Sequence, residues 1–317
     1  MTAGIAVSRD ALAERATRPS RFVRHPRAYI EIETVLRRDV QKAPELKSLR
    51  EIGLMREAGK LVARALRLCR EMAKPGVKTA DINQAVENLF VSHGATPLFK
   101  GYDPAQTGRP FPAVTCLSLN EQVVHGIPGQ RPLRDGDLLK VDTACRLNGW
   151  CADAAITLPI GVVRAERLRL IKVAEETLKV AIEEMGRRRW WSEVAGRMQR
   201  HVQEAGFAVV EQYVGHGIGR DMHESPQVPN FVNRDLQKRG DFRLEPGLVL
   251  AVEPMVNMSR SDVRTLDDQW TVVTQDGMPS VHVEHTLAVT ANGVVVVTAD
   301  EGDPAGEVRV PAAAAVK

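Results

Sequence analysis

Five residues between positions 142 and 284 have side chains that bind metal ions, and each lies in a short apolar or glycine-flanked segment: Asp142, Asp153, His216, Glu253 and Glu284. A buried, unpaired carboxylate is costly, so it must be neutralised or paired. Four carboxylates carry four negative charges, which balance the charge of two divalent cations. The set therefore predicts a two-metal hydrolytic site.

The two aspartates lie in the segment DLLKVDTACRLNGWCADAAITL. Asn148-Gly149 predicts a two-residue hairpin turn, because both residues tolerate positive φ. This turn pairs Ala144 with Asp153, and Asp142 is two residues from Ala144 on the same strand. Both aspartates then face one side, on a diagonal of about 7–8 Å. The alternative, a solvent-facing pair on a half-buried hairpin, stays open for the aspartates alone.

The histidines lie in the segment YVGHGIGRDMHESPQV, in which His216 stands between glycines and His223 follows seven residues later. Glycines beside a histidine permit close approach of the backbone to a ligand. A lone histidine is more often structural than a ligand. Two histidines in a Gly/Pro-rich loop without amphipathic period favour a functional loop.

The glutamates each interrupt a run of β-forming residues. Glu253 follows the apolar LVLAV and precedes proline, and Glu284 lies in SVHVEHTLAVT. Alternation along a strand puts Glu284 and His282 on one face and His285 on the other. These three residues therefore cannot all bind one ion.

Helices and strands alternate in blocks along the chain. Ser48-Leu-Arg-Glu51 is a capping box that begins a helix, which ends at Lys74-Pro75-Gly76. A second helix is expected from Thr79 to about His93-Gly94, and helical patterns cover residues 164–185 and 192–205. Strand-like runs are AVTCLSL, LVLAVEPMV, WTVVT, VHVEHTLAVT and VVVVT. This order predicts an α+β fold with two related halves around one sheet system.

Composition limits the class of protein. Apolar content is 44%, and the net charge of +3 does not by itself indicate nucleic acid. The four cysteines include no C-x-x-C, and the hairpin register puts Cys145 and Cys151 on opposite faces, which disfavours a disulfide between them. We find neither an apolar run of about twenty residues nor a secretory signal, so a cytoplasmic protein without a membrane span is expected.

The chain divides into three parts. Residues 1–45 include the arginine-rich RATRPSRFVRHPR, which indicates a solvated basic extension in preference to a dedicated binding arm. Residues 46–299 are expected to form the catalytic domain. Residues 300–317, rich in Ala, Gly and Pro, are expected to be a flexible tail.

The motifs together resemble those of the type I methionine aminopeptidases. NEQVVHGIPG, two aspartates eleven apart, YVGHGIGRDMHESPQV, AVEPMVN and EHT occur in the family's order between about Leu46 and Thr298. Five motifs in order are far more specific than one. The resemblance implies the pita-bread fold, a curved antiparallel sheet with pseudo-twofold related halves covered by helices. It also implies hydrolysis of the first peptide bond of nascent proteins, which removes the initiator methionine when the second residue is small.

The resemblance also assigns roles to residues. The five residues named first match the family's ligands for two divalent ions (Mn, Fe(II), Co or Zn), and Glu253 is expected to shuttle a proton. His125 and His223 match two catalytic histidines that contact substrate. Further substrate-binding positions, which form the methionine pocket, are Phe111, Cys116, Met222 and Trp270, with Tyr102 nearby. From the residues alone, Cys116 and Trp270 are equally compatible with an ordinary core.

Departures from the family's pattern concern the pocket and its surroundings. The loop between Tyr102 and Phe111 is longer than the usual bacterial form, Met222 stands where an aromatic residue is common, and His282 stands where glutamine is common. None of these departures removes a ligand. They bear on substrate tolerance and metal preference.

Two alternatives to a methionine aminopeptidase are a noncatalytic pita-bread binding protein and an X-Pro peptidase of the same fold. Binding proteins of this fold lose metal ligands, whereas all five positions are intact here. X-Pro peptidases carry an additional N-terminal domain for which 45 residues leave no room. We expect a monomer that acts on N-termini of nascent polypeptides, with a ribosome contact through the basic extension as a further hypothesis.

Overall fold

The computed structural model describes residues 43–104 and 106–300. The expected basic extension, apart from its last three residues, and the expected tail from residue 301 lie outside this part, so the three-part division stays a prediction. Within the described residues, no helix is long and apolar enough to cross a membrane.

Two helices precede the main sheet, and both agree with the sequence prediction. Helix α2 (Leu49–Met72) begins at the predicted capping box. The backbone N–H of Glu51 donates to Ser48 Oγ over 3.4 Å, and the Glu51 carboxylate accepts from the backbone N–H of Ser48 over 2.8 Å. Helix α3 (Thr79–Ser92) follows after the Lys74-Pro75-Gly76 break.

The hairpin of β4 (Leu138–Leu147) and β5 (Trp150–Pro159) has the predicted register. Ala144 is the partner of Asp153, and Asn148 and Gly149 form the turn with φ of 51° and 81°. Side chains of alternate β4 residues, among them Leu139 and Val141, pack against α2 and α3. The intervening residues therefore face the opposite side of the sheet.

The second half contains α4 (Ala165–Met185), α5 (Trp191–Glu204), β9 (Val249–Val252), β14 (Glu284–Thr290) and β15 (Gly293–Val296). Two runs predicted as single strands are divided between sheets. After β9 the chain passes through Glu253 and Pro254 into β10 (Met255–Asn257), and Val283 separates β13 (Ser280–His282) from β14. Proline has no N–H to continue a ladder, which accounts for the first break.

The principal sheet has nine strands and is antiparallel in every pairing. Its order is β1-β4-β5-β14-β9-β7-β8, with β15 added beside β14 and β2 beside β4. The two smaller sheets have the orders β13-β10-β6 and β11-β12-β3. The strands not yet bounded are β1 (Thr96–Pro97), β2 (Cys116–Leu119), β3 (Gln122–Val124), β6 (Ala208–Val209), β7 (Gly215–Gly217), β8 (Glu224–Val228), β11 (Val263–Thr265) and β12 (Val272–Thr274).

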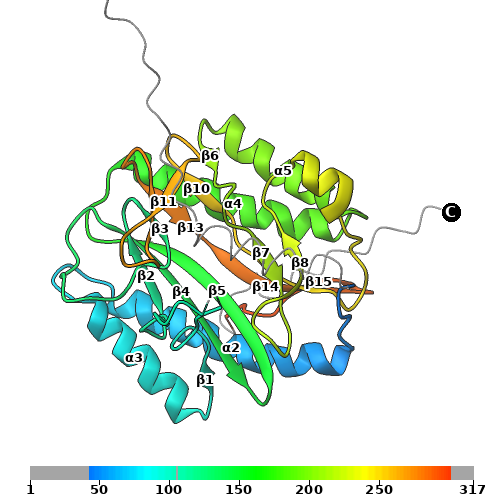
Figure 1. Ribbon diagram of the computed structural model, residues 1–317, viewed down its shortest axis with the longest axis horizontal. Coiled ribbons are helices and arrows are strands. Elements are labelled where there is room, and N and C mark those ends of the chain that lie inside the picture. The colour runs from blue at the N-terminus through cyan, green and yellow to red at the C-terminus, as the bar shows by residue number, and fades with distance from the viewer. Residues whose placement is uncertain (1–42, 105, 301–317) are drawn as a thin grey trace, which may run out of the picture.

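Helices cover the sheet in two pairs, which gives the molecule two comparable halves (Figure 1). The α2–α3 pair packs on β4 and β5, and the α4–α5 pair packs on β9 and β14. The first turns of α2 also contact Val249 and Ala288 of the second half. A Cβ at Gly59, in the middle of α2, would collide with the carbonyl oxygen of Val297, so the helix and this strand end approach too closely for any side chain there.

Candidate metal centre

The two aspartates project from the hairpin on the face away from α2 and α3. Ala152 and Ala154, which flank Asp153 in sequence, pack into the core beneath those helices, so Asp153 points the other way. Asp142 is also on this face, where its backbone partner on β2 is Cys116. Both carboxylates are buried, with 9% and 4% exposure for Asp142 and Asp153.

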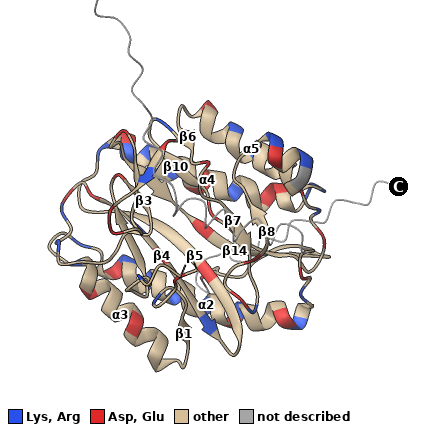
Figure 2. Cartoon of the chain, viewed as in Figure 1, with Lys and Arg blue, Asp and Glu red and all other residues tan. Residues whose placement is uncertain are grey.

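Strand pairing brings the second half's candidate ligands beside these aspartates. Glu284 begins β14 and is the partner of Ala155, while His216 on β7 is the partner of Ala251 on β9. Ligand atoms of Asp153, His216 and Glu284 all lie within 4.8 Å of one another. Glu253 directly follows β9, and its Oε1 lies 3.7 Å from His216 Nε2. Figure 2 shows acidic positions within strands that are otherwise largely uncharged, whereas most charges lie on the helices and the connecting loops.

The carboxylates strongly disfavour ionisation in the absence of a cation. Burial, followed by the charge of Asp153, raises the pKa of Asp142, Glu253 and Glu284 well above their usual range. Burial also raises the pKa of Asp153 to about 7. Desolvation penalises an isolated carboxylate, and a divalent cation at this place relieves both the desolvation and the repulsion.

His216 offers a lone pair to the same place. Its Nδ1 lies 2.9 Å from the carbonyl oxygen of Gly217, which only accepts, so Nδ1 carries the proton and Nε2 is free to coordinate. Burial lowers the pKa of His216 to about 4, which keeps the ring neutral at physiological pH.

The glycines beside His216 permit a close approach of β7 to its neighbouring strands. A Cβ at Gly215 would collide with the carbonyl oxygen of Ala251 on β9, and one at Gly217 with that of Ser225 on β8. The close approach seen here is therefore to neighbouring strands. It lets β7 lie tightly between them and fixes the position of the imidazole.

The residues present fit a divalent metal. Three buried carboxylate oxygens have no hydrogen-bond partner in the described part of the chain: Asp142 Oδ1, Asp153 Oδ1 and Glu284 Oε1. Buried polar atoms in native proteins are otherwise nearly always paired. Oxygen donors with one imidazole nitrogen suit divalent ions such as Mn, Fe(II), Co and Zn.

The two histidines expected to contact substrate lie at this centre. The rings of His216 and His223 are 4.2 Å apart between centroids. The Tyr102 hydroxyl lies 2.8 Å from His223 Nδ1. His125, in the left-handed region with φ of 58°, packs its ring edge-on against Trp270 at 6.3 Å. Burial lowers the pKa of His125 to about 4 and that of His223 well below its usual value.

The predicted pocket residues form two groups. Phe111 and Cys116 belong to one buried apolar cluster, against which Trp270 packs, with the Phe111 and Trp270 rings 5.3 Å apart. Met222 instead lines a hollow of about 400 Å³ together with Tyr102 and His223. The other residues that line this hollow are Leu98, Lys100, Gly101, Arg146 and Asp221.

Comparison with known proteins identifies the family. A family model, metallopeptidase family M24, matches residues 53–291. This chain belongs to metallopeptidase family M24. A methionine aminopeptidase of Clostridium perfringens is 44% identical over 80% of this chain and 98% of its own length, and methionine aminopeptidase 1 of Bacillus subtilis is 42% identical over 80% and 98%.

Solved structures agree with this membership. The crystal structure of a methionine aminopeptidase from Thermotoga maritima aligns with a TM-score of 0.76 at 36% identity, covering 81% of this chain and all of that one. The predicted resemblance and pita-bread fold are therefore confirmed. The expectation of an enzyme, and not of a noncatalytic binding protein, is also confirmed. As an M24 metallopeptidase, the chain uses divalent metal.

Two residues of the M24 metallopeptidase that support the centre were given no such role from the sequence. Thr286 Oγ1 donates to the carbonyl oxygen of Asp153 over 2.8 Å and accepts from its backbone N–H over 3.0 Å. Tyr102, expected only as a neighbour of the pocket, contacts His223. No sequence signal identifies either contact, because the partners are 133 and 121 residues apart.

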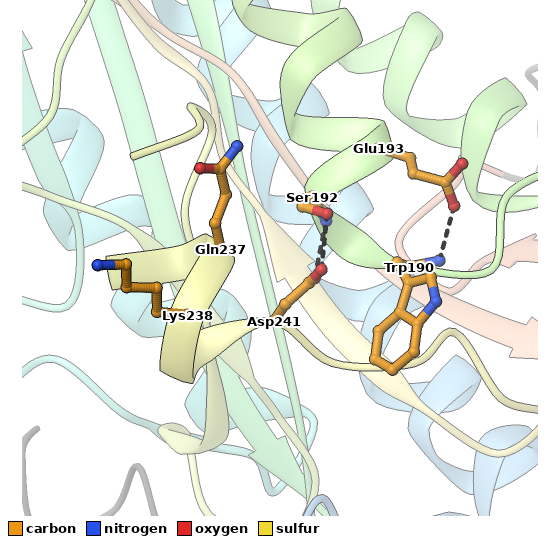
Figure 3. A pocket seen from close by; sticks show the side chains of 6 residues that line it. All are labelled: Trp190, Ser192, Glu193, Gln237, Lys238 and Asp241. Atoms are coloured by element: carbon orange, nitrogen blue, oxygen red, sulfur yellow. Dashed lines mark hydrogen bonds between the residues drawn. The ribbon is translucent and has the colours of Figure 1, made fainter. Parts of the chain in front are cut away.

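A second hollow, of about 420 Å³, lies between the start of α5 and the short helix η1 (Leu236–Gly240) (Figure 3). None of the metallopeptidase's candidate ligands lines it. Its most buried polar contact is internal, since Asp241 accepts from both the backbone N–H and the hydroxyl of Ser192. Both carboxylate oxygens of Asp241 are therefore already hydrogen-bonded within the protein.

Proposed function

We propose that this M24 metallopeptidase removes the initiator methionine from nascent polypeptides whose second residue is small. The observation that carries the proposal is the convergence of three buried carboxylates, the partly buried Glu253 and the Nε2 of His216. Relatives at 42–44% identity that are named methionine aminopeptidases support the choice of substrate.

Asp142, Asp153, His216, Glu253 and Glu284 would hold two divalent ions, of which Mn, Fe(II), Co and Zn are the candidates. The charge count supports two ions, because four carboxylates balance four positive charges. When bound, the metal lowers the pKa of water and polarises the scissile carbonyl. The two aspartates lie on one hairpin, and the other three proposed ligands lie in the second half. The register of the paired strands therefore sets the spacing of the ligands.

Glu253 is the proposed proton carrier. Its carboxylate is only 14% exposed and would be ionised beside bound metal, so it could accept a proton from the attacking water. The same carboxyl group then delivers the proton to the leaving amine. It directly follows β9 and precedes Pro254, so it lies outside the strand ladder.

His223 and His125 would act on the substrate. With Tyr102 donating to its Nδ1, His223 carries its own proton on Nε2 and can donate to the oxyanion that develops on the carbonyl. His125 packs edge-on against Trp270, beside the cluster that contains Phe111 and Cys116. These apolar and polarisable side chains suit a methionine side chain. Met222, which lines the same hollow as His223, would contact the substrate residues that follow the N-terminal methionine.

The test is release of methionine from short peptides by the purified, metal-loaded protein. Met-Ala-Ser should be cleaved, Met-Leu-Ser should be a poor substrate because of its bulky second residue, and Ala-Pro-Ser should not be cleaved. Chelation should abolish activity and added Mn²⁺, Fe²⁺ or Co²⁺ should restore it. Undiminished activity after thorough chelation, or preference for the X-Pro peptide, would contradict the proposal.

A monomer acting in the cytoplasm on chains emerging from the ribosome is part of the same proposal. Residues 1–45 carry the arginines that would contact ribosomal RNA phosphates. Deletion of this segment should reduce co-sedimentation with ribosomes at low salt and leave cleavage of Met-Ala-Ser intact. Unchanged co-sedimentation would contradict the proposed ribosome contact and would leave the proposed reaction unaffected.

A further inference from the structure

His282 lies at the end of β13 and is 1% exposed. Its backbone is fixed by Thr157 of β5, whose hydroxyl donates to the His282 carbonyl oxygen over 2.7 Å and accepts from its N–H over 3.1 Å. The position of the imidazole is therefore set by a neighbouring strand as well as by its own sheet. None of the roles proposed above uses this histidine.

Neither ring nitrogen of His282 has a hydrogen-bond partner in the described part of the chain. A buried N–H without a partner costs the free energy of its desolvation, so such a group calls for an explanation. The acceptor that faces the ring is Glu253, whose Oε2 lies 3.6 Å from His282 Nε2.

Glu253 stands between two histidines that present different atoms to it. Its Oε1 faces His216 Nε2 at 3.7 Å, and its Oε2 faces His282 Nε2 at 3.6 Å. The proton of His216 is on Nδ1, because Gly217 accepts it there, so His216 offers Glu253 only a lone pair. Of these two rings, His282 alone is able to donate to the carboxylate.

A donor role for His282 requires one ring N–H, on the nitrogen that faces an acceptor. A neutral imidazole places its proton on the nitrogen that has an acceptor. Here that nitrogen is Nε2, which faces the carboxylate.

We infer that His282 is a positioning residue, which donates from Nε2 to Glu253 Oε2 and so holds Oε1 toward His216 and the metal. The inference rests on the proposed function, since Glu253 is one of the proposed ligands. The separation exceeds a hydrogen bond by roughly half an ångström, a gap that a small rotation of the Glu253 side chain closes. Hydrogen bonds that orient a ligating group typically contribute about 10–100-fold to metal affinity.

The test measures Mn²⁺ affinity of the metal-free full chain by calorimetry, together with the Tm of the metal-free protein. His282→Leu removes the donor at similar volume and should weaken Mn²⁺ binding by about 10–100-fold. His282→Gln retains an N–H donor of similar reach and should bind within about threefold of the unaltered protein. His201→Leu, on α5 and away from the centre, is the matched control and should leave the affinity unchanged.

Two results would overturn the inference: unaltered affinity in His282→Leu, or equal losses in the Leu and Gln variants. If His282→Leu does not fold, as its Tm would reveal, His282→Met replaces it as the donor-free variant. The proposed function is tested separately. If the unaltered protein binds Mn²⁺ but does not release methionine, the proposed reaction is refuted, and the measured Mn²⁺ affinities still test the role of His282.

Discussion

The hydroxyl of Tyr102 lies 2.8 Å from Nδ1 of His223, and their rings are 5.3 Å apart between centroids. This contact joins a loop of the first half to the histidine-bearing loop of the second half, at the hollow beside the candidate metal centre. Burial raises the pKa of Tyr102 to about 12, so the phenol keeps its proton and is able to donate it to Nδ1. A hydrogen bond donated in this direction holds the histidine in the tautomer that has its own proton on Nε2.

Tyr102→Phe should therefore lower kcat/KM for Met-Ala-Ser by about tenfold, since one hydrogen bond contributes about 1 kcal/mol and the tautomer is no longer fixed. Steady-state kinetics measure the effect. Lys100→Ala is the matched control, because Lys100 lines the same hollow but pairs with Glu87 at the surface. Equal kcat/KM values for Tyr102→Phe and the unaltered protein would contradict a positioning role for Tyr102.

Glu253→Gln should reduce kcat by about 10²–10⁴-fold, because the amide carries no proton between water and amine. The metal-free variant should be at least as stable as the unaltered protein at pH 8. The reason is that it lacks a buried carboxyl group whose ionisation is unfavourable there. Single-turnover kinetics and thermal unfolding measure the two effects. Glu211→Gln, on the surface, is the control, and a normal kcat in Glu253→Gln would contradict the proton-carrier role.

Metal affinity should rise between pH 6 and pH 8. The raised pKa of the four carboxyl groups, about 7 for Asp153, means that protons occupy the centre at pH 6 and must leave when metal binds. His216, with a pKa of about 4, is already neutral and adds nothing to this dependence. Calorimetric titration with Mn²⁺ in two buffers of different ionisation enthalpy counts the released protons. A pH-independent affinity would show that the carboxyl groups are already ionised.

The same pKa shifts set the stability of the metal-free protein above pH 6.5. A folded-state pKa above the unfolded value, as for Asp153, gives stability that is lost as pH rises through the folded value. The buried histidines have folded pKa values below 6.5, so they act only at lower pH. The increase in Tm on adding Mn²⁺ should therefore be larger at pH 8 than at pH 6.5, as thermal unfolding would measure. An equal increase at both values would contradict this linkage.

Gly59→Ala should destabilise the protein by about 1–3 kcal/mol, because the new Cβ collides with the carbonyl oxygen of Val297 and forces α2 away from it. Gly53→Ala is the matched control in the same helix, since a Cβ there meets nothing within 4 Å. That change should stabilise by about 0.5–1 kcal/mol through helix propensity. Urea unfolding of both variants measures the change in the free energy of unfolding. Equal changes in the two variants would mean that α2 can move away from Val297 without loss of stability.

Local signals explain which parts of the fold were predictable. The Asn148-Gly149 turn fixes a register, so the common face of Asp142 and Asp153 follows from the sequence alone. The Ser48 capping box likewise fixes the start of α2. The division of 280–290 between two sheets was not predictable, because its β-forming pattern continues through Val283 while the neighbours that separate the sheets are distant in sequence. The same distance concealed the contacts of Tyr102, Thr286 and His282.

Strand β14 lies between β5 and β9 in the sheet and begins with Glu284, although it is among the last strands along the chain. During synthesis, the hairpin that carries Asp142 and Asp153 leaves the ribosome well before the strand that must join it to β9. Until this central strand is inserted, β5 and β9 are not joined, so the aspartates of the first half cannot meet the ligands of the second half. A product terminated before position 284 would lack the strand that joins β5 to β9, so an enzyme that acts on newborn chains could become competent only after nearly all of its own chain had been made.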